Sequence, residues 1–180
     1  MKVLAVDGSP AGGGRTDTAA RAVLAGAQEL GAETSLVSLS APEGVDEALA
    51  ALGECHAFVF ASPIYRASYA TPMKALLDRL PRGMWGETEA PLQGRAVAIV
   101  ATGATFHHFL GLQDLRHVLA SFFAAHVLPP GLYVPGEGFD EAKQLLPDYA
   151  AAAALTGRAL VEQAKALAAA PSLSALRPQA

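Results

Sequence analysis

Cysteine is nearly absent from the sequence, since Cys55 is the only one among 180 residues. One thiol forms neither an internal disulfide nor a cysteine-based zinc site, and it is typical of a protein kept in a reducing compartment. Apolar runs long enough to cross a bilayer are also lacking, because the alanine-rich stretch after Tyr149 is interrupted by charged residues from Arg158 onward. The first apolar run ends at Asp7, which is too short for a signal peptide. We therefore expect a cytoplasmic protein.

An excess of positive charge is missing as well. Thirteen Lys and Arg residues stand against 17 Asp and Glu residues, giving a net charge of −4. Proteins that bind a nucleic-acid backbone or an anionic membrane surface usually carry a basic excess. We therefore expect neither nucleic acid nor a membrane as a partner.

The short motifs of hydrolases and metalloenzymes do not occur. The sequence contains no G-x-S-x-G, and its five histidines do not form H-E-x-x-H. His107 and His108 are adjacent, so their side chains are expected to point in different directions. We expect no catalytic triad and no metal.

The sequence does have enough apolar residues for a full core. Hydrophobic residues make up 52% of the chain, and 180 residues suit one domain better than two. We expect a single domain over residues 1–170, followed by an irregular tail over 171–180.

Short apolar runs alternate with longer segments in which apolar residues recur every three or four positions. This alternation indicates strands that are each followed by an amphipathic helix. Strands are expected at 2–6, 33–39, 57–61, 95–101 and within 126–134, and helices at 16–30, 45–52, 71–80, 109–124 and 141–170.

Several local signals support the proposed helix boundaries. Thr71 followed by Pro72 is typical of an N-cap and a first helical turn, and Gly31 is a plausible end for the first helix. Asp17 precedes Arg21 by one helical turn, so the two are expected to pair on the outer face.

The expected strands are apolar on both faces, which predicts a parallel sheet with helices on each side. In such doubly wound α/β folds, ligands bind beyond the carboxyl ends of the strands, where the strand order reverses. The loops to consider are therefore those after the first, third and fourth strands, with the sequences DGSPAGGGRTDT, SPIYRASYAT and TGATFHH.

The first loop is rich in glycine but matches neither common nucleotide motif. Gly14 stands where a Walker A loop needs lysine, and Asp17 stands where a dinucleotide fingerprint needs its third glycine. The loop still combines flexible backbone, hydroxyl groups, Arg15 and a helix N-terminus, which suits a monophosphate. The alternative is a plain flexible turn in which Arg15 is solvated.

The second and third loops indicate a slot for a flat ring beside that phosphate site. Tyr65 and Arg66 lie in a stiff turn at the expected ligand edge, and Gly103 allows a close approach of backbone. His107 or His108 lies where it can cover a ring. Alternatively, the second loop is only a packed turn and Arg66 a solvated charge.

These motifs resemble the NAD(P)H-dependent FMN reductases, a family of flavodoxin-like fold. The resemblance extends over residues 2–135 and is greatest to the flavin reductases that supply two-component sulfonate monooxygenases. It is carried by Gly8-Ser9-Pro10, Arg15-Thr16, Ser62-Pro63-Ile64-Tyr65-Arg66-Ala67-Ser68-Tyr69, Lys74-Ala75-Leu76-Leu77-Asp78 and Ala101-Thr102-Gly103.

The resemblance implies a flavodoxin-like three-layer sandwich with a five-stranded parallel sheet in the order 2-1-3-4-5. It also implies that FMN binds with its phosphate in the first loop and its isoalloxazine ring against the other two. The implied cofactor-binding residues are Ser9, Arg15, Thr16, Asp17 and Thr18 for the phosphate, Pro63, Ile64, Tyr65 and Arg66 for the ring, and Thr102, Gly103, Ala104 and His108 for its pyrimidine side.

The sequence departs from the family pattern at one position in the first loop and one in the third. Gly14 replaces a common phosphate-binding serine, and Ala104 replaces a second glycine. As partners, the resemblance implies nicotinamide and flavin nucleotides, a flavin-dependent monooxygenase, and a second copy of the chain in a homodimer or homotetramer packed through the helix after Tyr69.

Three functions are compatible with these residues. The first is an NADPH- or NADH-dependent FMN reductase, in which hydride transfer requires proximity and orientation and no catalytic acid or base. The second is a quinone or azo-compound reductase with tightly bound FMN. The third is a flavodoxin-like electron carrier, although such carriers tend to be more acidic than this chain.

Overall fold

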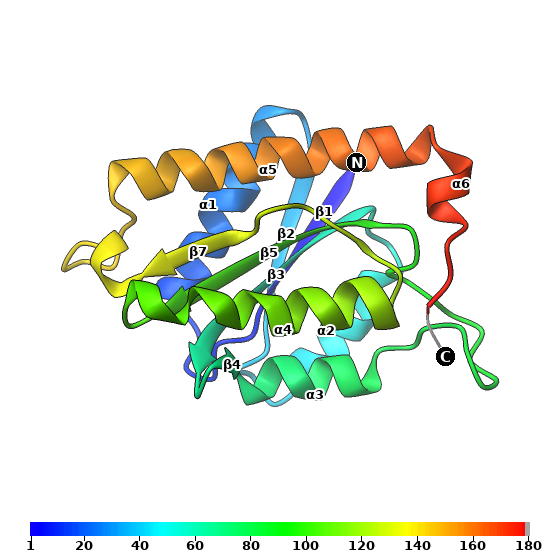
Figure 1. The fold of residues 1–180 in the computed structure, drawn as a ribbon, viewed down its shortest axis with the longest axis horizontal. Coiled ribbons are helices and arrows are strands. Elements are labelled where there is room, and N and C mark those ends of the chain that lie inside the picture. Colours follow the sequence, from blue (N-terminus) through cyan, green and yellow to red (C-terminus); the bar gives the residue numbers. More distant parts are fainter. Residues whose placement is uncertain (179–180) are drawn as a thin grey trace.

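The computed structural model of the chain describes residues 1–178 as an α/β structure in three layers. Figure 1 shows α1 and α5 over one face of the central sheet and α2, α3 and α4 over the other. The strands are β1 (Lys2–Asp7), β2 (Glu33–Ser38), β3 (Ala57–Tyr65), β4 (Ser68–Tyr69), β5 (Ala96–Gly103), β6 (His126–Val127) and β7 (Leu132–Pro135), and the helices are α1 (Arg15–Glu29), α2 (Gly44–Leu52), α3 (Thr71–Arg79), α4 (Leu112–His117), α5 (Pro147–Ala168) and α6 (Pro171–Ser174).

The sheet confirms the flavodoxin-like topology. Its strands follow the order β2-β1-β3-β5-β6, with parallel pairing throughout this path. Because β5 is the fourth parallel strand along the chain and β6 the fifth, this is the expected order 2-1-3-4-5. The carboxyl ends of β1, β3 and β5 therefore lie side by side at one edge.

The fifth strand is divided into two pieces. β6 pairs with the start of β5, and β7 pairs with its end, from Val100 to Gly103. Between the two pieces lie Pro129 and Pro130, which have no backbone N–H to donate to a neighbouring strand. The short strand β4 was not expected, and it pairs antiparallel with the end of β3.

The core has two halves, one on each face of the sheet. Alternate residues of a strand point to opposite faces, so Val3 and Ala5 pack with α1 and α5 while Leu4 and Val6 pack on the other side. All four side chains are completely buried. This explains why the strands read as continuous apolar runs.

Helices α1 and α5 approach each other closely enough that two positions need glycine. A Cβ added at Gly157 would lie 1.9 Å from the carbonyl oxygen of Val23, and one at Gly26 would lie 2.1 Å from that of Ala154. The glycines let the two helix backbones touch. The contact fixes α1, whose N-terminus follows the first glycine-rich loop.

The ends of α1 match the local signals, whereas the start of α3 does not. Arg21 pairs with Asp17 at 2.8 Å, and Gly31 adopts a φ of +79° just after the helix. The expectation that Thr71 caps α3 is wrong, because Ala70 takes the N-cap position and Thr71 is already helical. Pro72 lies in the first turn as expected.

The helix expected over 109–124 is three segments of different winding. A 3₁₀ segment η1 (Phe106–Gly111) leads into α4, which passes into a π-helical turn η2 (Val118–Phe122). Apolar periodicity does not distinguish these windings over so short a length.

The last long helix begins later than its apolar pattern indicates. After the 3₁₀ turn η3 (Gly136–Gly138), an antiparallel bridge joins Phe139 to Leu145, and Asp140 accepts a hydrogen bond from the backbone N–H of Gln144. α5 then starts at Pro147 instead of residue 141. Proline at this position suits a first turn, where its missing N–H has no partner to lose.

The expected irregular tail contains a short helix in its described part. A hydrogen bond of 2.9 Å joins the ring Nε2 of His126 and the carbonyl oxygen of Leu173, within α6. The last two residues of the expected tail, 179–180, lie outside the described part of the chain. None of the helices within residues 1–178 combines the length and the apolar character needed to span a membrane.

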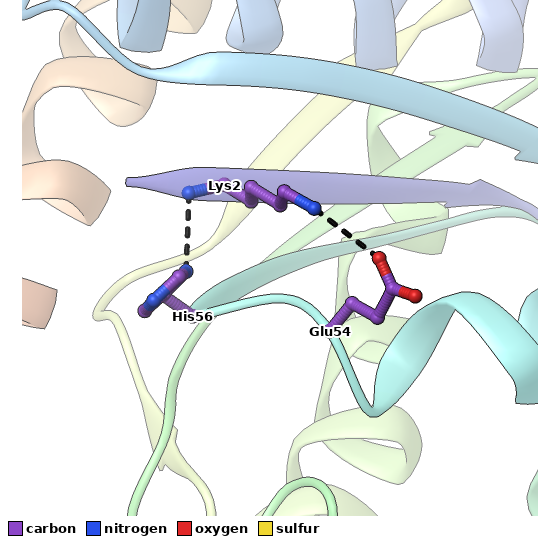
Figure 2. A network of polar contacts seen from close by, with 3 residues as sticks. All are labelled: Lys2, Glu54 and His56. Carbon is purple, nitrogen blue, oxygen red and sulfur yellow. Dashed lines mark hydrogen bonds and ion pairs between the residues drawn. The ribbon is translucent and has the colours of Figure 1, made fainter.

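At the amino ends of the strands, polar contacts join β1 to the segment before β3. The ammonium group of Lys2 lies 3.2 Å from the carboxylate of Glu54, and the backbone N–H of Lys2 donates to Nδ1 of His56 at 3.1 Å (Figure 2). These contacts lie at the edge of the sheet opposite to the carboxyl ends. We therefore assign them a structural role.

Candidate functional site

A cavity of about 430 Å³ lies at the carboxyl ends of β1, β3 and β5. Its size falls within the range usual for small-molecule sites. It is formed by the three loops selected from the sequence, together with a residue from the turn before α5. The lining residues are Ser9, Ala11, Gly14, Arg15, Thr16, Pro63, Ile64, Tyr65, Thr102, Gly103, Ala104 and Lys143.

The first loop turns from β1 into α1 through backbone that favours glycine. Gly12 and Gly13 have φ values of +62° and +55°, a region that other residues seldom adopt. Gly14 is the N-cap of α1 and has no side chain with which to cap the helix. The first backbone N–H groups of a 15-residue helix are thus available beside the cavity. This arrangement favours an anion such as a phosphate.

Two threonine hydroxyls join the first loop to the third. The Oγ atoms of Thr16 and Thr102 lie 2.8 Å apart, and both side chains are buried. This hydrogen bond links residues 86 positions apart in the sequence. It fixes the start of α1 against the end of β5. It also occupies part of the hydrogen-bonding capacity of the Thr16 hydroxyl, which was expected to face the phosphate.

Asp7, the last residue of β1, places a completely buried carboxyl under the loop. Its Oδ1 accepts the backbone N–H of Ser9 at 2.9 Å, whereas Oδ2 has no hydrogen-bond partner among the described residues. Burial raises the pKa of this carboxyl to about 6, against the opposing effect of the Ser9 N–H. Asp7 was not among the site residues expected from the sequence, although a charged residue ending an apolar strand is a recognisable signal.

Two cations line the same cavity. The guanidinium of Arg15 lies over the ring of Phe139, 5.5 Å from its centroid, which orients this long side chain. Lys143 reaches the cavity from the turn before α5, where it has a φ of +62°. Lys143 was not among the site residues expected from the sequence, because residues 141–146 were expected to be helical.

The second loop is a tight hairpin between β3 and β4. Arg66 and Ala67 occupy its two central positions, with φ values of 53° and 68°, and Tyr65 pairs with Ser68 across it. These angles match a type I′ turn, which fits the twist of the flanking strands. The turn leaves Pro63, Ile64 and Tyr65 along the cavity wall and places Arg66 at the exposed tip.

The third loop is held in place by Tyr133 of β7. Its hydroxyl donates to the carbonyl oxygen of Thr105 at 2.6 Å, and a Cβ at Gly103 would lie only 2.1 Å from that hydroxyl oxygen. His108 also contacts this turn, with Nδ1 3.1 Å from the Thr105 hydroxyl oxygen. Gly103 is therefore needed for close packing, and contacts from Tyr133 and His108 hold the loop where it lines the cavity.

The structure brings most of the residues selected from the sequence to one cavity, with four exceptions. The side chain of Asp17 pairs with Arg21. The backbone N–H of Thr18 donates to the carbonyl oxygen of Gly14 in the first turn of α1. Arg66 lies at the hairpin tip, and His108 contacts the turn behind Gly103. None of the four side chains lines the cavity. Within residues 1–178, no group of three or more His, Cys, Asp and Glu side chains is placed to hold a metal.

Taken together, the walls are two peptide segments, Pro63–Tyr65 and Thr102–Ala104, and the floor is a helix N-terminus with two cations. Backbone groups of the segments can donate and accept hydrogen bonds at the edge of a flat heterocycle. The floor suits a phosphate attached to that ring system. The arrangement therefore fits a nucleotide-like ligand such as FMN.

Residues 1–140 match the protein family described as NADPH-dependent FMN reductase. The chain is 36% identical over 93 residues to the NADH-dependent FMN reductase SfnF of Pseudomonas putida, an alignment that covers 52% of this chain and 46% of that protein. It is also 36% identical over 78 residues to the FMN reductase (NADPH) of Escherichia coli (strain K12), covering 43% and 37%. These alignments span about half or less of the relatives' length.

Solved structures show a similar fold. An apo NADH:FMN oxidoreductase (EMOB) superposes with a TM-score of 0.76 at 24% identity, covering 96% of this chain and 93% of that one. A flavodoxin from the domain Archaea gives a TM-score of 0.65 at 19% identity, covering 92% and 99%. At these identities the similarity shows the fold alone.

Proposed function

The chain belongs to the NADPH-dependent FMN reductase family, and on this basis we propose that it transfers a hydride from NADPH or NADH to FMN. The observation that carries the proposal is the cavity itself, in which an uncapped helix N-terminus and two cations adjoin the two peptide segments that form its walls. This combination suits a ring that bears a phosphate.

The residues divide into those that would hold the phosphate and those that would hold the ring. The backbone N–H groups at the start of α1, with Ser9, Arg15 and Lys143, would bind the phosphate. The segments Pro63–Tyr65 and Thr102–Ala104 would lie against the ring. When bound, FMN supplies a ring system that accepts a hydride.

The residues of the cavity contribute orientation more than acid–base chemistry. Hydride transfer depends on holding the two reacting atoms at short range. The walls of the cavity are suited to this task, because Tyr133 holds the third loop and the hairpin after β3 holds the second. Tyr65 is 54% exposed at the cavity wall, which leaves room for a nicotinamide to approach from solvent.

We further propose that the reduced flavin leaves the site and supplies a partner flavin-dependent monooxygenase. The support is the exposure of aromatic side chains near the site, because Tyr65 on the cavity wall and two residues of the segment after the third loop are all exposed. Phe106 and Phe109 are 58% and 42% exposed on η1, next to the third loop.

We also propose that the chain forms a homodimer or homotetramer through the face that carries α3. A second cavity of about 390 Å³ lies there, lined by residues that include Tyr69, Leu77 and Phe122. Trp85, on its wall, is 79% exposed. Exposed apolar surface of this kind commonly marks an interface.

The oligomer can be tested by sedimentation of two variants. Phe122→Glu should reduce the mass of the particle in solution, because it places a charge in the proposed interface. Leu155→Glu is the control, since Leu155 is 60% exposed on α5, on the opposite face. A wild-type monomer, or equal masses for all three proteins, would contradict the proposal.

The reductase is tested with purified protein, by recording the visible spectrum and following NADPH and NADH oxidation with and without added FMN. Oxidation that rises to saturation with free FMN supports a flavin reductase that releases its product. A yellow protein whose activity is indifferent to added FMN and rises with quinones or azo compounds indicates the second function. A flavin-binding protein that oxidises neither nucleotide indicates an electron carrier.

A further inference from the structure

The buried carboxyl of Asp7 lies under a loop whose other features favour the binding of an anion. Asp7 ends β1, and the next residue but one, Ser9, lines the cavity. The carboxyl takes the backbone N–H of Ser9 for its Oδ1, so this donor is directed to the protein. An ionised carboxylate here adds a negative charge beside a site that otherwise attracts anions.

The groups around Asp7 do not neutralise that charge. Its neighbours on the two adjacent strands, Ser38 and Ala61, are uncharged. The charged groups of α1 that act on Asp7 are Asp17 and Arg21, which are paired with each other. Asp17 disfavours the ionised form of Asp7, and Arg21 favours it. Its Oδ2 has no hydrogen-bond partner among the described residues. A buried carboxylate with an unpaired oxygen is costly, and protonation removes the cost.

A bound phosphate strengthens this preference. Two like charges at a given separation repel more strongly in a protein interior than in water. A protonated carboxyl removes the repulsion, and its O–H can act as a donor where the ionised form only accepts. The phosphate and a proton on Asp7 therefore favour each other's binding.

We propose that Asp7 is a positioning residue that couples phosphate binding in the first loop to uptake of one proton. The inference rests on the proposed FMN site, and it states which protonation state of the protein binds the phosphate. FMN is then held most tightly when Asp7 is protonated, and as Asp7 ionises with rising pH the affinity of wild type falls relative to that of a protein without this carboxyl. Riboflavin, which has the same ring without the phosphate, escapes this effect.

The coupling can be measured by titrating FMN into wild-type protein and Asp7→Asn. Asparagine keeps the acceptor for the Ser9 N–H and carries no charge. The variant should bind FMN about tenfold more tightly than wild type at pH 8, and equally within about twofold at pH 5.5. The reason is that, if bound phosphate raises the pKa of Asp7 by about one further unit, ionisation of Asp7 costs wild type about tenfold in FMN affinity. The Kd of riboflavin should be the same for the two proteins at both pH values.

A second measurement needs no variant. Calorimetric titrations of wild type at pH 7, in two buffers of different ionisation enthalpy, report the protons taken up with the ligand. The phosphate of FMN is mostly dianionic at this pH, since its second pKa is about 6. We expect net uptake of about a third of a proton with FMN, and none with riboflavin.

The outcomes separate this inference from the function on which it rests. If neither FMN nor riboflavin binds at any pH, the proposed cofactor site is wrong. If FMN binds without proton uptake, and the ratio of its affinities for Asp7→Asn and wild type is the same at pH 5.5 and pH 8, the proposed role of Asp7 is wrong while the site stands. The same conclusion follows if riboflavin shows the pH dependence of FMN.

Discussion

Arg15 is one of two cationic side chains that line the cavity, and the one that starts α1. Its guanidinium is oriented over Phe139 and is suited to a charge-assisted hydrogen bond with a phosphate. We predict that Arg15→Ala weakens FMN binding by about 1.5 to 3 kcal/mol, the usual worth of a hydrogen bond to a charged group. Fluorescence titration of FMN measures this change.

The matched control for Arg15 is Arg95→Ala. Arg95 is exposed just before β5, at the amino end of the sheet and away from the cavity. It should leave the affinity for FMN unchanged. Equal affinities for wild type and Arg15→Ala would remove this guanidinium from the site.

Asp7 also affects the free energy of unfolding. Its pKa is raised from 3.8 to about 6 by burial, so between these values the folded protein holds a proton that the unfolded chain releases. This contribution to stability is therefore complete below pH 3.8 and is lost as pH rises to about 6.

We predict that Asp7→Asn is more stable than wild type at pH 8 by up to about 3 kcal/mol, and has nearly the same stability at pH 4, where the aspartic acid is mostly neutral. Urea unfolding at the two pH values measures the difference. Glu89→Gln, at an exposed carboxylate in the loop after α3, serves as the control and should change little. A gain that is equal at pH 4 and pH 8 would show that the charge of Asp7 is not responsible.

At the scale of elements, the contact between α1 and α5 determines where the loop before α1 lies. Gly157 faces the backbone of α1 at a distance that leaves no room for a methyl group. We predict that Gly157→Ala lowers the free energy of unfolding by about 3 kcal/mol, because the helices must separate to admit it. Urea unfolding gives the value directly.

Gly53→Ala is the control for this substitution. Gly53 has a φ of −62° at the end of α2, and a Cβ there meets no atom within 4 Å. Its stability should stay within about 0.5 kcal/mol of wild type. If Gly157→Ala were equally neutral, the two helices would not be in contact as described.

At the scale of the whole molecule, a ligand that binds only the folded state raises its stability. The cavity is built from three loops and the turn before α5, so the ligand joins segments that are far apart in the chain. We predict that FMN at about 100 times its Kd stabilises the protein by about 2.7 kcal/mol, and raises its Tm by roughly 5 to 10 °C.

A thermal melt with and without FMN measures this shift. Riboflavin at the same concentration should raise the Tm less, because it lacks the phosphate that the helix N-terminus and the two cations would bind. A shift of equal size for the two flavins would indicate that the first loop does not hold the phosphate.

The sequence by itself determined the order of elements and the edge of the sheet where the cavity lies. Apolar runs that alternate with helical periods predict a parallel sheet, and the carboxyl ends of parallel strands meet at one edge. Loops that lie far apart in the chain could be assigned to one site on this basis. The glycines of the first loop were recognisable too, because few other residues adopt positive φ.

Only the tertiary structure decided which side chains face that cavity. The Thr16–Thr102 hydrogen bond, the burial of Asp7 and the arrival of Lys143 from the turn before α5 each depend on contacts between segments distant in the chain. The division of the fifth strand and the late start of α5 depend on similar contacts. Periodicity describes a segment's own preference, whereas the environment that surrounds a side chain is created only when the segments pack.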